Sequence, residues 1–242
     1  MAEEVLALLE LTGSEQILDV GCGEGKITAE VSARVPSGSV VGVDPSHDMI
    51  QFAHDHFSGG NLRFEVADAR RLSFRNEFDL VVSFNALHWI PDQDAALRSI
   101  HLALVTGGRT QFRLVTAGAR QSLESVVEET RTAPKWQTYF KNFHDPYLRL
   151  TADEYVAVAE RNGFRVQRVH THDRSWDFGS RPAFANFSSV GLVAWTRYLP
   201  PVERPTFVDD VLNRYRAVAA SGPGEENTFK FYQTDIAMRK SR

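Results

Sequence analysis

The fold of this chain is decided by the stretch ILDVGCGEG, residues 17–25. A short apolar run leads directly into Gly21, Gly23 and Gly25. Glycine adopts left-handed backbone conformations at no steric cost, so the chain can turn sharply here and approach a ligand closely. A helical pattern over residues 27–33 follows, and the free N–H groups of a helix N-terminus favour bound anionic groups. The stretch predicts a strand, a ligand-binding turn and a helix; the plain alternative is a tight turn without a ligand.

The spacing of the glycines discriminates between cofactors. A dinucleotide-binding fingerprint has its third glycine one residue later, where this chain has Lys26. A cofactor with a pyrophosphate is therefore poorly matched, and a nicotinamide-dependent oxidoreductase is disfavoured. A Gly-x-Gly-x-Gly loop preceded by Asp19 instead suits a cofactor with an amino-acid tail.

Apolar runs with little polar alternation recur along the first 115 residues, separated by helical patterns. Such strands are typical of a parallel sheet that helices cover on both faces. Gly107 and Gly108 are expected to turn the chain into the last of them. The expected strands are residues 17–20, 39–43, 62–66, 78–83 and 110–115. The predicted fold class is α/β.

The pattern changes beyond the fifth strand. Residues 119–150 look helical and aromatic-rich, with two prolines as interruptions. A helix is expected from Thr151, its N-cap, to Asn162, with Gly163 as its terminator. A further helical stretch covers roughly residues 181–220.

Two carboxylates follow the next two strands. Asp44 ends the second strand, where an acidic residue can accept hydrogen bonds from both ribose hydroxyls of a nucleotide. Asp68 comes just after the third strand, where it could accept from an adenine amino group. Either residue alone could be a loop or cap residue. Because the carboxyl ends of parallel strands share one edge of the sheet, the two together with the glycine loop predict an adenosine site.

Residues 17–115 resemble the core of class I S-adenosylmethionine-dependent methyltransferases. The stretch SFNALHWIPDQ, residues 83–93, narrows the resemblance to juvenile hormone acid methyltransferases and, slightly more distantly, to trans-aconitate methyltransferases. Shorter motifs extend it over most of the chain. They are PKW at 134–136, YF at 139–140, DPY at 145–147 and FKF at 229–231.

The resemblance implies a Rossmann-like, mostly parallel sheet of seven strands, with an antiparallel last strand and helices on both faces. Residues 163–171 and 228–238 would form the sixth and seventh strands. We expect a single methyltransferase domain over residues 1–242. Its expected parts are a cofactor-binding core, 14–115, and two helical lid inserts that serve the acceptor site, 116–162 and 181–220.

The resemblance also implies S-adenosyl-L-methionine as the cofactor and S-adenosyl-L-homocysteine as the product. Asp19 and the glycine loop would hold the methionine end, with Cys22 as a small apolar filler. Asp44 would bind the ribose, Asp68 would read the adenine, and Asn85 with Ala86 would lie close to the sulfonium. The implied cofactor contacts are Asp19, Gly21, Cys22, Gly23, Gly25, Asp44, Pro45, Ser46, Met49, Asp68, Ala69, Asn85 and Ala86.

His88 lies in the segment after the fourth strand and is the candidate for orienting or deprotonating the methyl acceptor. Histidine titrates near neutral pH, which suits a general base. The alternative is a histidine that packs and hydrogen-bonds after that strand. A carboxylate acceptor, with a free pKa of about 4, is already ionised at pH 7 and needs no base.

The acceptor is expected to be a small molecule. A carboxylic acid is the leading hypothesis, and another oxygen or carbon acceptor is the runner-up. Arg113, Arg149 and Arg197 could clamp a carboxylate. Aromatic residues could wall the acceptor pocket, although each could equally belong to the core. The candidates for this wall are Trp89, Trp136, Tyr139 and Tyr147.

Composition disfavours other classes of protein. The net charge is −4 and the basic residues are scattered, whereas a nucleic-acid binder carries a basic stripe. No apolar run approaches the ~20 residues that cross a bilayer, and the first residues lack the pattern of a signal peptide. Cys22 is the single cysteine, so no intrachain disulfide is possible. We expect a cytoplasmic protein without nucleic-acid or membrane partners; the sequence predicts no oligomeric state.

Metal binding is not expected, since the pairs His54/His56 and His170/His172 have no third ligand beside them. The resembling families carry an N-terminal helical segment that closes over the cofactor. This chain has about 15 residues before its first strand, so we expect that lid to be truncated or built differently. A non-catalytic adenosine-binding module is the rival from a different functional class.

Overall fold

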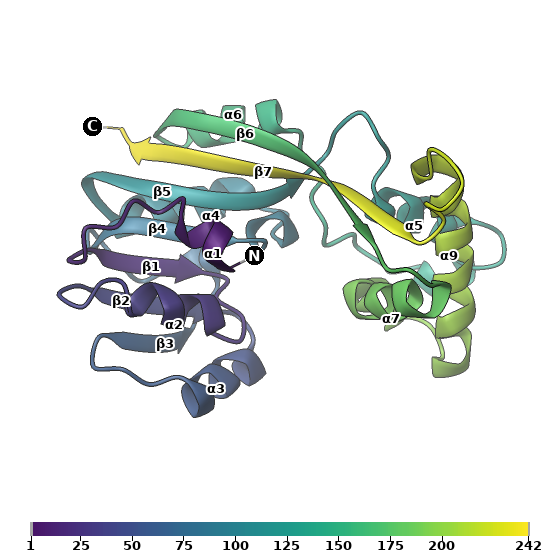
Figure 1. Ribbon diagram of the computed structural model, residues 1–242, viewed down its shortest axis with the longest axis horizontal. Coiled ribbons are helices and arrows are strands. Elements are labelled where there is room, and N and C mark those ends of the chain that lie inside the picture. The colour runs from purple at the N-terminus through teal and green to yellow at the C-terminus, as the bar shows by residue number, and fades with distance from the viewer. Residues whose placement is uncertain (1, 242) are drawn as a thin grey trace. The chain divides into compact units, whose positions relative to one another are not determined.

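The computed structural model describes residues 2–241 (Figure 1). The strands are β1 (Gln16–Val20), β2 (Ser39–Asp44), β3 (Leu62–Val66), β4 (Phe78–Phe84), β5 (Leu104–Thr116), β6 (Phe164–Asp177) and β7 (Thr228–Lys240). The helices are α1 (Ala2–Leu6), α2 (Lys26–Ser32), α3 (His47–His56), α4 (Gln93–Ala103), α5 (Leu123–Thr132), α6 (Ala152–Arg161), α7 (Arg181–Gly191), α8 (Val193–Thr196) and α9 (Arg204–Ala219). Short 3₁₀ turns are η1 (Ala69–Arg71), η2 (Leu87–Trp89), η3 (Gln137–Phe140) and η4 (Pro201–Glu203).

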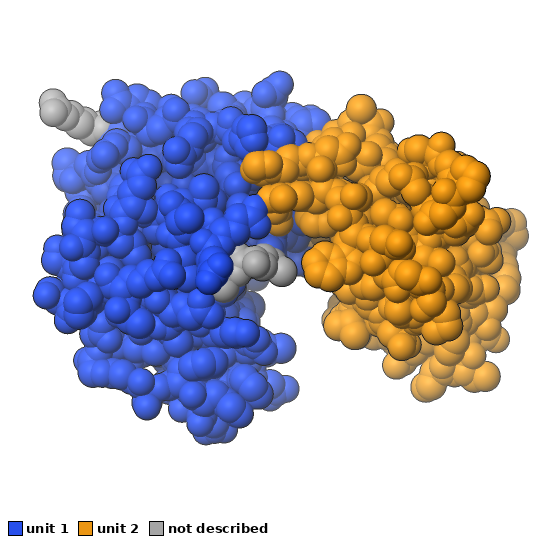
Figure 2. All heavy atoms as spheres, viewed as in Figure 1, with its two compact units in different colours: residues 1–115, 150–171, 234–242 blue, residues 116–149, 172–233 orange. Residues whose placement is uncertain are grey.

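The chain divides into two compact units, which Figure 2 shows in different colours. The helix α6, which the sequence analysis included in the first insert, belongs to unit 1. The expected single domain with two inserts stays a prediction. Unit 1 comprises Met1–Val115, Leu150–Thr171 and Thr234–Arg242, and unit 2 comprises Thr116–Arg149 and His172–Gln233.

The strands form a seven-stranded sheet in the order β3-β2-β1-β4-β5-β7-β6. β1 pairs in parallel with β2 and β4, β2 with β3, and β4 with β5. The arrow of β7 points against those of β1 and β5 (Figure 1), so the expected mostly parallel, Rossmann-like sheet with an antiparallel last strand is confirmed. Successive strands are added on one side of β1 up to β3, and β4 then starts the other side, so the strand order reverses between β1 and β4. A switch point of this kind opens a crevice at the carboxyl ends of the strands.

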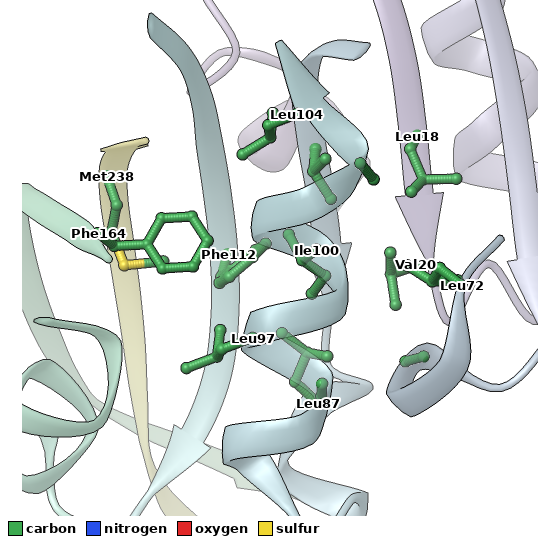
Figure 3. Packing of buried hydrophobic residues seen from close by; sticks show 14 of the residues in the cluster. Leu18, Val20, Leu72, Leu87, Leu97, Ile100, Leu104, Phe112, Phe164 and Met238 are labelled. Atoms are coloured by element: carbon green, nitrogen blue, oxygen red, sulfur yellow. The ribbon is translucent and has the colours of Figure 1, made fainter. Parts of the chain in front are cut away.

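The sheet of unit 1 is buried on both faces. On one face, Leu18 of β1 lies in an apolar cluster with Ile100 of α4 and Phe112 of β5 (Figure 3). On the other face, Ile17 of β1 packs in a second cluster with Val31 of α2. Successive strand residues point to opposite faces, so one short apolar run supplies both clusters. This explains why the strands lack polar alternation.

The fifth strand begins earlier than expected. It starts at Leu104, directly after α4, and not after a turn at Gly107 and Gly108. Its register with β4 shifts between Phe78 and Leu80, as at a β-bulge. Gly107 has a φ of 76°, which residues with a Cβ rarely adopt. The expected turn is therefore corrected to an irregularity within a longer strand.

The helix expected after residue 150 is confirmed. The Thr151 hydroxyl accepts a hydrogen bond from the Glu154 N–H, and the Glu154 carboxylate accepts one from the Thr151 N–H. This reciprocal capping box satisfies two N–H groups that the first turn leaves unpaired. Beyond the helix, Gly163 has a φ of 84°, which allows the chain to leave the helix. The helical stretch expected over residues 181–220 is also present, as α7 to α9.

Residues 119–150 are less helical than expected. This stretch forms α5 and the η3 turn, and residues 141–149 are irregular. Proline lacks an N–H and clashes with a preceding helical turn, and Pro134 follows directly beyond the end of α5 while Pro146 lies in the irregular part. The two interruptions that the sequence shows therefore limit the helices more than was expected.

No helix among residues 2–241 combines the length and apolar character that crossing a bilayer would need.

A buried ion pair joins β5 to β7 within unit 1. The Arg113 side chain is 1% exposed, and its Nε and Nη2 donate to the two carboxylate oxygens of Asp235 at 2.7 and 2.8 Å. Its Nη1 lies 3.5 Å from a carboxylate oxygen of Glu4 in α1. Two parallel charge-assisted hydrogen bonds fix the geometry of such a pair. The side chain of Arg113 therefore has a structural role in holding β5 to β7.

We expect Arg113→Met or Asp235→Leu alone to lower the free energy of unfolding by about 3–5 kcal/mol, because each removes both charge-assisted hydrogen bonds of the pair and leaves the other buried charge without them. The double variant should recover most of this loss, since it removes both charges. Urea denaturation measures all three. The matched control is Arg63→Met, whose exposed pair with Glu65 should be worth less than about 1 kcal/mol. Single-variant losses as small as the control's would contradict a buried pair.

Candidate active site

A pocket of about 460 Å³ opens within unit 1, at the carboxyl ends of β1, β2 and β4. This is the place that the switch point between β1 and β4 predicts. The predicted site residues on its wall are Gly21, Asp44, Pro45, Asp68, Ala69, Asn85, Ala86 and Trp89. The wall also contains residues that the sequence analysis did not single out, namely Val20, Val43, Ala67, Arg70, Leu87, Ile90 and Pro91.

The glycine turn after β1 requires residues without side chains. Gly21, Gly23 and Gly25 have φ values of 78°, 53° and 83°, so each uses the left-handed freedom of glycine. The N–H of Gly21 donates to the carbonyl of Val43 at 2.8 Å, which ties the turn to β2. A Cβ at Gly21 would lie 2.2 Å from the Cβ of Ala86. A side chain at this position would therefore displace the loop after β4.

The other two glycines differ in what surrounds them. A Cβ at Gly23 would meet no atom within 4 Å, so its backbone faces open space. A Cβ at Gly25 would lie 2.7 Å from the ring of Phe64 and 2.8 Å from the Cβ of Ala53. Gly25 therefore serves the packing of β3 and α3 at the start of α2, and Gly23 leaves the turn accessible.

Asp44 ends β2 and lines the pocket. One of its carboxylate oxygens accepts the N–H of Gly23 at 3.1 Å, and the other accepts the N–H of Ser46 at 2.9 Å. These two bonds orient the carboxylate from both sides. An ionised carboxylate offers about four lone-pair sites, so Asp44 keeps capacity for further donors such as ribose hydroxyls.

Asp19 lies beneath the glycine turn and not on the pocket wall. Its side chain is buried, and one carboxylate oxygen accepts the hydroxyl of Thr28 at 2.7 Å. Burial raises the pKa of Asp19 to about 6, with the charge of Asp44 adding to the rise and the Thr28 hydrogen bond opposing it. Thr28 was missed by the sequence analysis. A small polar residue on the buried face of the helix after the glycine turn is the signal that could have found it.

Asp68 lines the pocket from the start of η1. Its carboxylate accepts the Nε of Arg70 at 3.0 Å and the Nη2 of Arg70 at 2.6 Å. The guanidinium of Arg70 holds the pKa of Asp68 below its usual value. Arg70 was also missed, because a pairing between residues two apart in sequence depends on the local turn and leaves no periodic signal.

The loop after β4 supplies the opposite wall. Asn85 has a φ of 57°, uncommon for a residue with a Cβ and typical of functional or turn positions. Its N–H donates to the carbonyl of Arg113 at 2.8 Å. The buried hydroxyl of Ser83 donates to the carbonyl of Val20 at 2.7 Å and joins β4 to β1. Trp89 is 37% exposed and lines the pocket.

His88 is buried in η2 and is not among the pocket-lining residues. Its Nδ1 accepts the N–H of Val115 at 3.3 Å. Burial lowers the pKa of His88 to about 4, so the imidazole is neutral at pH 7. Its predicted role towards a methyl acceptor stays a prediction.

Other predicted cofactor residues lie off the pocket wall. Ser46 caps α3 by accepting the N–H of Met49, and Met49 is 46% exposed. Burial, followed by the charges of Asp19 and Asp44, raises the pKa of the Cys22 thiol, which agrees with its interpretation as a filler. Contact with the cofactor stays a prediction for all of these residues, on the wall or off it; those off the wall are Asp19, Cys22, Gly23, Gly25, Ser46 and Met49.

The predicted aromatic acceptor contacts belong to unit 2, apart from Trp89. Trp136 is fully buried and donates its indole N–H to Asp210 at 2.7 Å. Tyr147 is 6% exposed, while Tyr139 on η3 is 37% exposed. Burial, with the nearby Glu124 carboxylate adding to it, raises the pKa of the Tyr147 phenol. The acceptor role of all three stays a prediction.

Two of the three candidate arginines are engaged inside their own units. Arg113 pairs with Asp235 as described above. Arg149 pairs with Asp145 and donates to the backbone carbonyl of Glu124. Arg197 is exposed and stacks over the ring of Tyr198 at 5.3 Å. Arg113 and Arg149 are therefore less suited than Arg197 to clamp a carboxylate.

No group of three or more His, Cys, Asp or Glu side chains in the described part of the chain is arranged to hold a metal ion.

The fold and the pocket define the class as a Rossmann-like α/β protein with a ligand pocket at its switch point. Residues 17–108 match the methyltransferase domain family. The chain is 32% identical over 188 residues to the malonyl-acyl-carrier-protein O-methyltransferase of Geobacter sulfurreducens, covering 75% of this chain and 68% of that relative. The chain therefore belongs to the S-adenosylmethionine-dependent methyltransferases.

Both families named from residues 83–93 are among the relatives. Identity is 28% over 157 residues to the juvenile hormone acid O-methyltransferase of Bombyx mori, covering 62% of this chain and 56% of the relative. It is 37% over 165 residues to the trans-aconitate 2-methyltransferase of Deinococcus radiodurans, covering 67% and 63%. The predicted resemblance is confirmed, although this chain spans less than two thirds of these two relatives.

The fold is shared with solved methyltransferase structures. One is the phosphoethanolamine N-methyltransferase 2 of Haemonchus contortus, solved with phosphomonomethylethanolamine and S-adenosylhomocysteine. It superposes with a TM-score of 0.63 at 16% identity, over 100% of this chain and 53% of that one. At this identity the likeness concerns the fold.

We expect Asp44→Ala to weaken binding of S-adenosylhomocysteine by about 1.5–3 kcal/mol for each lost hydrogen bond to the charged acceptor. Isothermal titration calorimetry measures this. The control is Asp48→Ala, which changes an exposed carboxylate in the first turn of α3 and should leave the affinity unchanged. Unchanged affinity in a folded Asp44→Ala protein would remove Asp44 from the site.

The raised pKa of Asp19 predicts a pH-dependent affinity. Asp19 is predicted to hold the methionine end of the cofactor, whose ammonium group would favour the ionised carboxylate, whereas burial makes this form costly until the pH exceeds about 6. Affinity for S-adenosylhomocysteine should therefore fall by about tenfold as the pH drops from about 7 to 5. Calorimetry across this range measures it, and Asp19→Asn should flatten the profile. An equally steep profile in Asp19→Asn would assign the effect to another group.

Proposed function

We propose that this protein transfers a methyl group from S-adenosylmethionine to a carboxylate oxygen of a small-molecule acid. One observation carries the choice of acceptor. The pocket wall after β4 contains Asn85, Ala86, Leu87, Trp89, Ile90 and Pro91, and none of these side chains is a base. The ionisable side chains on the described pocket wall are Asp44, Asp68 and Arg70. Asp44 accepts two backbone N–H groups, and Asp68 and Arg70 pair with each other.

The pocket suits an adenosyl cofactor with an amino-acid tail. Ala86 leaves no room for a side chain at position 21, whereas the backbone of Gly23 faces open space. Asp44 would hold the ribose hydroxyls and Asp68 the adenine amino group. Asn85 and Ala86 would lie nearest the sulfonium. When bound, S-adenosylmethionine supplies an electrophilic methyl group, and S-adenosylhomocysteine is the product.

The protein's own contribution would be alignment and exclusion of water. Methyl transfer from a sulfonium is an in-line displacement, so holding the two reactants in line supplies much of the rate. Trp89, Ile90 and Pro91 present apolar surface to the pocket, which would limit the entry of water. The backbone of Asn85, fixed by its bond to Arg113, would keep the wall in one position.

A carboxylate acceptor is consistent with the absence of a base on this wall. A carboxylic acid with a pKa of about 4 is ionised at pH 7 and can attack without losing a proton, whereas a hydroxyl acceptor needs a general base. His88 does not line the pocket, and burial lowers its pKa to about 4, which makes its imidazole a weak base. The names of two relatives, juvenile hormone acid O-methyltransferase and malonyl-acyl-carrier-protein O-methyltransferase, also support acid acceptors. The cytoplasmic location stays a prediction.

Mass spectrometry of products tests the proposal. The protein is incubated with isotopically labelled S-adenosylmethionine and a mixture of apolar monocarboxylic and polycarboxylic acids, alongside matched alcohols, phenols and amines. We expect labelled methyl esters from the acids and, with S-adenosylmethionine at saturating concentration, a flat pH–rate profile between about 6 and 9 because the acceptor stays ionised. Asp44→Ala is the matched variant, and it should need a higher concentration of S-adenosylmethionine to reach half of its maximal rate.

Three outcomes would contradict the proposal. Transfer to hydroxyls alone, with a steep ionisation near pH 7, would indicate another O-methyltransferase that uses a base. Cofactor binding without transfer to any acceptor would indicate a non-catalytic adenosine-binding module. Binding of NADH without binding of S-adenosylmethionine would indicate an oxidoreductase.

A further inference from the structure

The loop after β4 is attached to β5 at two points. At its start, the N–H of Asn85 donates to the carbonyl of Arg113 at 2.8 Å. At its other end, the Nδ1 of His88 accepts the N–H of Val115 at 3.3 Å. We call residues 85–89 the β4 loop. Both attachments use the same short segment of β5, two residues apart, so the loop is held between fixed points.

The second attachment depends on a side chain, whereas the first uses backbone alone. His88 is 6% exposed and its neighbour Leu87 is fully buried, while Trp89 is 37% exposed and lines the pocket. Consecutive residues of a 3₁₀ turn point about 120° apart, because three residues complete the turn. Holding His88 inside the protein therefore sets the direction in which Trp89 projects.

The chemical state of His88 suits an acceptor. A neutral imidazole has one donor and one acceptor nitrogen, and burial keeps His88 neutral by lowering its pKa to about 4. The N–H of Val115 donates to Nδ1, so Nδ1 is the acceptor nitrogen and the proton is on Nε2.

Another buried side chain holds the β4 loop and the residue that follows it. The amide nitrogen of Gln93 donates to the carbonyls of Leu87 and Ile90, each at 2.6 Å. Gln93 is 3% exposed. The backbone of this turn also forms two hydrogen bonds, from the Trp89 N–H to Ala86 and from the Ile90 N–H to Leu87, each at 3.0 Å, and Asn85 has a φ of 57°. The side-chain hydrogen bonds of His88 and Gln93 add to these backbone bonds and attach the turn to the residues around it.

We infer that His88 is a positioning residue: its Nδ1 fastens the β4 loop to Val115 and so presents Asn85, Ala86 and Trp89 to the cofactor pocket. This inference rests on the proposed function for the identity of the ligand. His88 acts as a neutral hydrogen-bond acceptor through the loop, and it takes no proton from the methyl acceptor.

Two substitutions at one position separate these roles. In His88→Asn, the amide oxygen can take the place of Nδ1 and accept the N–H of Val115, but it cannot serve as a base. In His88→Phe, a ring of similar size remains without an acceptor. We expect His88→Asn to bind S-adenosylhomocysteine within about threefold of the parent protein, and His88→Phe to bind on the order of tenfold more weakly, because the part-buried N–H of Val115 loses its partner.

The binding is measured by calorimetry, and the turnover of an acid substrate by its pH–rate profile. His88→Asn should keep the profile of the parent protein. The control is His54→Asn, an exposed histidine of α3, which should match the parent in both measurements. Equal loss in His88→Asn and His88→Phe, or an ionisation near pH 7 that disappears in His88→Asn, would overturn the inference in favour of a base.

Hydrogen exchange of the Val115 amide tests the attachment without any ligand. This amide should be protected in the parent protein and in His88→Asn, and should exchange at least about tenfold faster in His88→Phe. Equal protection in all three proteins would overturn the inference. If the parent protein fails to bind S-adenosylhomocysteine but the exchange pattern holds, the proposed function fails while the attachment stands, so the two failures are distinguishable.

Discussion

The contact between Gly21 and Ala86 is the constraint on which the site depends. A Cβ at Gly21 would lie 2.2 Å from that of Ala86, a separation that no side chain can accept. The loops after β1 and β4 therefore meet directly at the point where the sheet switches direction. Because this contact closes the space between them, the pocket forms to one side, against Asp44 and Asp68.

The three carboxylates near this contact each accept hydrogen bonds from other groups of the protein. Asp44 accepts two backbone N–H groups, Asp68 is held by Arg70, and the buried Asp19 depends on the hydroxyl of Thr28. Hydrogen bonds to a charged group are stronger than those between neutral groups. The three carboxylates are thus oriented by the protein itself, and Asp19, which does not line the pocket, is held beneath the glycine turn.

The sequence was sufficient for the sheet and for most of the pocket wall because both follow from local rules. Uninterrupted apolar runs predict strands buried on both faces, and residues at the carboxyl ends of parallel strands share one edge. Asp44 and Asp68 could be placed for that reason, whereas Asn85 and Ala86 were placed by the resemblance to known methyltransferases.

Contacts between distant segments could not be predicted. The pairing of Arg113 with Asp235 joins residues 122 apart in sequence, and neither residue carries a periodic signal of its partner. The bulge in β5 was mistaken for a turn because Gly107 and Gly108 are typical of both. The sequence could not predict that His88 is buried, for a similar reason. Its partner is the backbone N–H of Val115, and any residue type at position 115 other than proline would offer the same N–H.

A crystal structure of the protein with S-adenosylhomocysteine is the most direct test of the central claim, that the carboxyl ends of β1, β2 and β4 hold an adenosyl cofactor. The account predicts density in the pocket, with the ribose hydroxyls within hydrogen-bonding distance of the Asp44 carboxylate and the sulfur nearest Asn85 and Ala86. Density for the ligand elsewhere, or an empty pocket at saturating ligand, would contradict it.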